Sequence, residues 1–70
     1  MSTFDQMQQC AETTKAVFQA AVTGLRYAFC SIELTGAGRI LLVRAGDERG
    51  PLVGYREDYL GVTSWYVRPR

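Results

Sequence analysis

An apolar stripe within residues 2–25 is the feature that most constrains the fold of this chain. Its members recur at alternating spacings of three and four residues: Phe4, Met7, Ala11, Thr14, Phe18, Ala21 and Leu25. This spacing is typical of one side of an α-helix. We therefore predict a single long helix over about residues 3–24.

The ends of this predicted helix carry recognisable capping residues. Thr3 and Gln6 have the spacing of a capping box, and Ser2 and Asp5 form an alternative pair one residue earlier. Gly24 is placed to end the helix as a C′ residue, where a positive φ costs glycine nothing.

After Leu25 the chain consists of short segments with strand composition, separated by Gly, Pro and Asp. The predicted strands are about 26–34, 40–45, 52–56 and 62–68. Residues 57–61 fit either a tight turn or a bulge within a longer hairpin. We predict one α+β domain over residues 1–70, in which the N-terminal helix packs across one face of a three- to four-stranded antiparallel meander.

A chain of 70 residues has a marginal core, so extra stabilisation is expected. Cys10 and Cys30 are the only cysteines and follow no secretory signal, so we expect reduced thiols in the cytoplasm. Both thiols are predicted to be structural, with a pKa raised by apolar surroundings. Without histidine, two cysteines do not make a four-ligand zinc site. No apolar run approaches the roughly 20 residues that span a bilayer, which leaves self-association as the expected source of stability.

The charge pattern argues against strong nucleic-acid binding. The net charge is +1, and residues 26–70 carry seven arginines against five acidic residues. This excess is small compared with that of a typical nucleic-acid-binding domain. Arginine does suit planar, bidentate contacts with carboxylates and aromatic rings.

Catalysis is the function that the composition disfavours most. With no histidine, the usual general base and the usual partner of a Ser or Cys nucleophile are missing. Asp47-Glu48 and Glu57-Asp58 are adjacent acidic pairs, but such pairs in surface turns mostly serve as solvated charges, and neither has a calcium-loop spacing. We expect no enzyme activity, no cofactor and no metal.

A single helix covers only one face of a sheet, and the second face is also predicted to be apolar. The residues assigned to it are Tyr27, Phe29, Leu41 or Leu42, Tyr55, and Trp65 or Tyr66. An aromatic face of this size is rarely left to water. Either a second copy covers it, or another partner does, or the aromatic side chains turn toward the helix.

The residues assigned to partner binding combine rigid rings with arginines, which are enriched at protein interfaces. They are Tyr55, Arg56, Tyr59, Tyr66, Arg68 and Arg70. Trp65 is assigned to the core. The predicted dimer surface consists of Tyr27 and Phe29 together with Ala16 and Ala20, whose small side chains allow close approach.

These observations favour a small non-enzymatic protein-binding module, homodimeric, that occupies a surface of a macromolecular partner. Chains of this kind are common among small regulators and phage-encoded inhibitors, including anti-defence proteins. The alternative is single-stranded nucleic-acid binding through an aromatic and arginine sheet face. A small-molecule pocket ranks third, because so few residues leave little room for a cavity of about 300 Å³.

Overall fold

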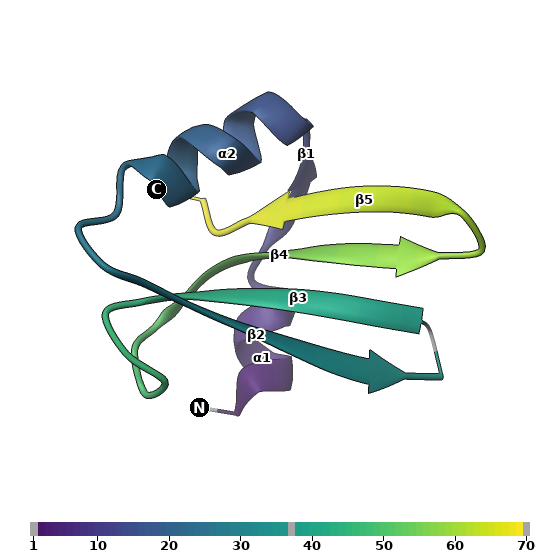
Figure 1. Ribbon diagram of the computed structural model, residues 1–70, viewed down its shortest axis with the longest axis horizontal. Coiled ribbons are helices and arrows are strands. Elements are labelled where there is room, and N and C mark those ends of the chain that lie inside the picture. The colour runs from purple at the N-terminus through teal and green to yellow at the C-terminus, as the bar shows by residue number, and fades with distance from the viewer. Residues whose placement is uncertain (1, 37, 70) are drawn as a thin grey trace.

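The computed structural model describes residues 2–36 and 38–69. Two helices and five strands form in these residues, and the strands make one antiparallel sheet in the order β1-β5-β4-β3-β2 (Figure 1). The elements are α1 (Thr3–Gln8), β1 (Ala11–Thr13), α2 (Lys15–Thr23), β2 (Ala28–Thr35), β3 (Gly38–Ala45), β4 (Leu52–Tyr59) and β5 (Val62–Val67). The predicted α+β class is confirmed, and β2 to β5 form the predicted meander, but the predicted count of three to four strands is wrong because β1 is a fifth strand of the sheet.

The predicted single helix over residues 3–24 is wrong. α1 ends at Gln8, and residues 11–13 form β1, which pairs with residues 65–67 of β5. Thr14 then starts α2 as its N-cap, because its hydroxyl accepts a hydrogen bond from the backbone N–H of Val17 over 3.2 Å. Pairing between the two ends of the chain has replaced the middle turns of a continuous helix.

The helix ends also correct the sequence prediction in two places. Ser2 is the N-cap of α1 and accepts from the N–H of Asp5 over 3.2 Å, so the alternative pair of Ser2 and Asp5 is the one used. Gly24 ends α2 with a φ of −72°, so the predicted positive φ at this glycine is wrong.

The segment 57–61 resolves into strand and turn. β4 continues to Tyr59, and Leu60 and Gly61 make the connection to β5 with φ angles of 50° and 78°. Two successive positive φ angles are typical of the type I′ turns that suit β-hairpins. A register shift does occur in the sheet, but between Val43 and Arg44, where β3 pairs with β4.

α1 and α2 cover opposite faces of the sheet. A Cβ built on Gly54 would lie 3.4 Å from the Phe18 ring of α2. The next residue, Tyr55, instead packs against the buried cluster of Ile40, Leu42 and Leu52, as does Met7 of α1. Because successive residues of a strand point to opposite faces, we call these the α2 face and the α1 face. In Figure 1, α2 accordingly lies at the upper edge of the sheet, and α1 lies behind the lower strands β2 and β3.

The core lies along β3 and the start of β4. On the α1 face it consists of Ile40, Leu42 and Leu52, and on the α2 face Phe18 approaches Gly54. Leu42 and Leu52 are each 1% exposed. Burying a side chain of this size contributes roughly 1.5–3 kcal/mol. The register shift beside Arg44 explains why Leu52 points to the face opposite that of Gly54.

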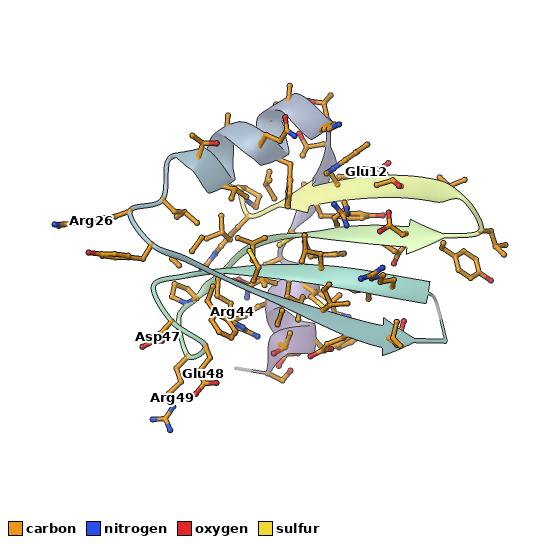
Figure 2. All side chains as sticks on the ribbon, viewed as in Figure 1. Glu12, Arg26, Arg44, Asp47, Glu48 and Arg49 are labelled. Atoms are coloured by element: carbon orange, nitrogen blue, oxygen red, sulfur yellow. The ribbon has the colours of Figure 1, made fainter. Side chains whose placement is uncertain are left out.

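Two polar contacts attach α1 to the sheet. The Gln6 side-chain oxygen accepts from the backbone N–H of Leu52 over 2.8 Å. Arg44 donates to the Thr3 hydroxyl over 2.6 Å and to the backbone oxygen of Gly50 over 3.2 Å. Arg44 therefore lies on the α1 side of the β3–β4 loop, while the neighbouring Arg49 extends away from the molecule (Figure 2).

Candidate functional site

β2 is the most exposed long strand of the sheet. It pairs with β3 through all eight of its residues, and within the described residues no strand lies along its other edge. Seven of the eight residues are exposed, including Ile32 at 51% and Leu34 at 83%. A long edge strand with exposed apolar side chains is a template for pairing with another chain.

The residues predicted to form the dimer surface lie on two elements. Tyr27 precedes β2 and is 68% exposed, and Phe29 lies in β2 at 37%. The Arg26 guanidinium carbon lies 5.8 Å from the centre of the Tyr27 ring, a cation–π distance. Ala16 and Ala20 lie on the exposed side of α2. The structure thus keeps Tyr27 and Phe29 beside the open edge and places the two alanines on another element.

Tyr55 and Tyr66 stack on each other across β4 and β5. Their ring centres lie 4.5 Å apart at an interplanar angle of 10°, and both side chains are half-buried on the α1 face. Burial raises the pKa of Tyr55 above its ordinary value, and the neighbouring Tyr66 adds to this rise. These two tyrosines are part of the packing under α1, so the predicted aromatic face is partly covered by a helix of the chain itself.

Arg56 points to the opposite face from these tyrosines. Its cross-strand partners are Leu41 and Trp65, and its Nε lies 3.4 Å from Asp58 Oδ2. That distance makes an ion pair without good hydrogen-bond geometry, since Nε has no hydrogen-bond partner among the described residues. Asp58 also accepts from the Thr63 hydroxyl over 2.6 Å. The predicted partner-binding set is therefore divided between the two faces.

The remaining predicted partner-binding residues lie toward the ends of β4 and β5. Tyr59 is the last residue of β4 and is 47% exposed. Arg68 follows β5 and is exposed, and its backbone N–H donates to the backbone oxygen of Val53 over 2.8 Å. Arg70 lies outside the described residues. Trp65, assigned to the core, is half-buried.

The two cysteines have different surroundings. Burial raises the pKa of the Cys10 thiol, as predicted, although the charge of Arg68 lowers it in part. Cys30 is exposed, so this thiol does not have the core position expected of a structural cysteine. The reason is its position in β2, an edge strand of the sheet with seven of its eight residues exposed.

An open pocket of about 450 Å³ lies between α1 and the sheet. The expectation that so short a chain leaves little room for a cavity of about 300 Å³ is therefore wrong. Its lining is mostly apolar, with Phe4 and Met7 from α1, Ile40 and Tyr55 from the sheet, and the carboxylates Glu33 and Glu57. The pocket is present because α1 ends at Gln8. A helix of six residues is too short to cover the whole α1 face of the sheet.

A second groove of about 310 Å³ runs between α2 and the strands β2 and β3. It is lined by Phe18 and Val22 of α2 and by Cys30, Leu41 and Val43 of the sheet. The groove is apolar and reaches the open edge at Cys30.

Ile32, Glu33 and Leu34 are residues of these sites that were not singled out from the sequence, and Glu57 was considered only within the acidic pair Glu57-Asp58. The placement of the three β2 residues depends on the register of β2 against β3. Gly36 and Gly38 stand two residues apart directly after Thr35, which is typical of a short hairpin loop. Because a short hairpin loop fixes which residues of the two strands face each other, this spacing indicates the register of β2 against β3.

Within residues 2–36 and 38–69, no cluster of three or more His, Cys, Asp or Glu side chains is arranged to hold a metal ion. Among the same residues, no helix has the length and apolar character needed to cross a membrane. Comparison of the chain with protein-family models, curated proteins and solved structures found no match.

Proposed function

We propose that this chain is a small non-enzymatic protein-binding module that works as a homodimer joined through β2. The supporting observation is the open edge of β2, with Ile32 and Leu34 exposed beside it. Edge-to-edge pairing of two β2 strands would join two five-stranded sheets and satisfy the free backbone groups of both edges.

The side chains of β2 favour a second copy of this chain as the occupant. In an antiparallel pair centred on Ile32, each Leu34 lies opposite Cys30 of the second copy, and each Glu33 lies opposite Ser31. Apolar residues then face apolar residues, and no like charges meet. Centring the pair on Glu33 instead would place two carboxylates opposite each other, which is destabilising.

The groove beside α2 supports the same arrangement. Cys30 lines that groove together with Phe18 and Val43. Directly opposed residues have Cβ atoms about 4.5–5.5 Å apart, so Leu34 of the second copy would lie at the mouth of the groove. Leu34, the most exposed large apolar side chain of β2, would thereby gain an apolar environment.

Sedimentation equilibrium over a wide concentration range tests this proposal. The expected result is a mass that rises from 7.8 kDa toward twice that value, and an Ile32→Lys variant that stays monomeric because two ammonium groups would meet on the axis. Val62→Lys is the matched control, since Val62 is 64% exposed in another strand. A wild-type chain that is monomeric throughout, or equal disruption by both variants, would overturn the proposal.

Single-stranded nucleic-acid binding is the second candidate. It is favoured by the cross-strand pair of Arg56 and Trp65 on the α2 face, since a ring beside a guanidinium is suited to stacking a base. Fluorescence anisotropy with a labelled oligonucleotide at low salt tests it. Affinity that falls steeply with added salt would support this candidate, and absence of binding at low salt would dispose of it.

A further inference from the structure

The pocket under α1 combines an apolar lining with two carboxylates. We propose that it binds a lysine side chain presented by a basic peptide segment of a protein partner. This inference rests on the proposed function, because it names the chemistry of the partner that such a module would bind.

The two carboxylates flank the floor of the pocket. Glu33 of β2 and Glu57 of β4 are both direct cross-strand partners of Ile40, which is 6% exposed. Strands lie about 4.8 Å apart, so the Cα atoms of the two glutamates are roughly 10 Å apart on the same face. A cation above Ile40 would therefore have a carboxylate on each side.

The charges of the pocket are not compensated by the chain itself. Within the described residues, Glu33 and Glu57 make no ion pair and no side-chain hydrogen bond. Arg44, a basic residue of this face, donates from its guanidinium to Thr3 and to the backbone of Gly50. The other arginine of this region, Arg56, pairs with Asp58 on the opposite face. The pocket is thus complementary to a positive charge.

The apolar lining fits the stem of a lysine. Phe4 is 66% exposed at the rim, and Met7, Ile40 and Tyr55 line the interior. A lysine side chain has a four-carbon apolar stem that packs on such surfaces while its ammonium group remains hydrated. An aromatic ring near the ammonium adds a cation–π attraction. A simple inorganic cation would gain nothing from this lining.

Titration of the full chain with a short peptide, followed by amide NMR shifts, tests the inference. The probe is Gly-Leu-Lys-Leu-Gly with blocked ends, and the reference is the same peptide with norleucine in place of lysine. We expect saturable shifts at Met7, Ile40 and Tyr55 with the lysine peptide. Glu33→Gln combined with Glu57→Gln should weaken binding about tenfold. Glu48→Gln is the matched control, because Glu48 lies in the β3–β4 turn and points away from the sheet (Figure 2).

Each outcome bears on the inference. Affinity for the lysine peptide that falls about tenfold in the double variant and is unchanged in Glu48→Gln supports it. Equal binding of the norleucine peptide, equal binding of n-butylammonium alone, or an unchanged affinity in the double variant would overturn it. Because these shifts are read at pocket residues and the mass is measured separately, a chain that binds the peptide as a monomer would contradict only the dimer.

Discussion

β2 and β3 are neighbouring strands of equal length that differ almost completely in burial. They pair through eight residue pairs, yet Leu42 of β3 is 1% exposed and Leu34 of β2 is 83% exposed. β3 has a strand on each side and side chains of α1 packed on it, whereas β2 has one neighbouring strand. Position in the sheet, and not apolar content, decides which of these side chains stabilise the isolated fold.

The largest expected effect tests this difference directly. Leu42→Ala should lower the free energy of unfolding by about 2–5 kcal/mol, because it leaves a cavity in the core. Leu34→Ala should change it by about 0.5 kcal/mol or less in dilute solution, where the chain is monomeric. Urea unfolding of both variants at low concentration checks this. A similar loss of unfolding free energy in Leu42→Ala and Leu34→Ala would contradict the difference between β3 and β2.

A smaller effect is expected where α1 is attached to β4. Gln6→Ala removes the acceptor for the backbone N–H of Leu52, a residue that is 1% exposed. An unsatisfied buried donor costs about 1–3 kcal/mol. Gln8→Ala, an exposed change on the same helix, is the control and should be nearly neutral. Thermal unfolding measures both, and equal shifts in Tm would show that the Gln6 contact does not hold the helix.

The smallest effect concerns alkaline pH. Burial and the adjacent Tyr66 raise the pKa of Tyr55 above 10, so the folded chain holds this proton more tightly than the unfolded chain. The resulting stability is complete below pH 10 and is lost as the pH rises through the folded pKa. Tyr55→Phe should lessen this alkaline loss, measured by urea unfolding at neutral pH and above pH 10. An unchanged alkaline loss would mean that Tyr55 is less buried than described.

The meander was predictable because its signals are local. Alternating side chains and turn residues are contained in each hairpin, so strands were expected in all four positions where β2 to β5 form. The positive φ of Leu60 was not predictable from the residue type, because leucine rarely adopts a positive φ.

The split of the N-terminal segment was not predictable from periodicity. Phe4 and Phe18 belong to one stripe, yet they lie in helices on opposite faces of the sheet. A spacing of three and four residues continues through Ala11, which lies in β1, so the pattern does not separate one helix from two. The deciding interaction is the pairing of Ala11 with Val67, far away in the sequence. The pocket under α1 was missed for the same reason, because a continuous helix would have filled its place.

Hydrogen–deuterium exchange of β2 at low and high protein concentration shows whether a second copy of the chain covers the open edge of this strand. If a second copy covers the open edge, amides of β2 that point away from β3 exchange rapidly in dilute solution and slowly at high concentration, while amides of β4 do not change. Exchange of β2 that is equally rapid at both concentrations would contradict the account.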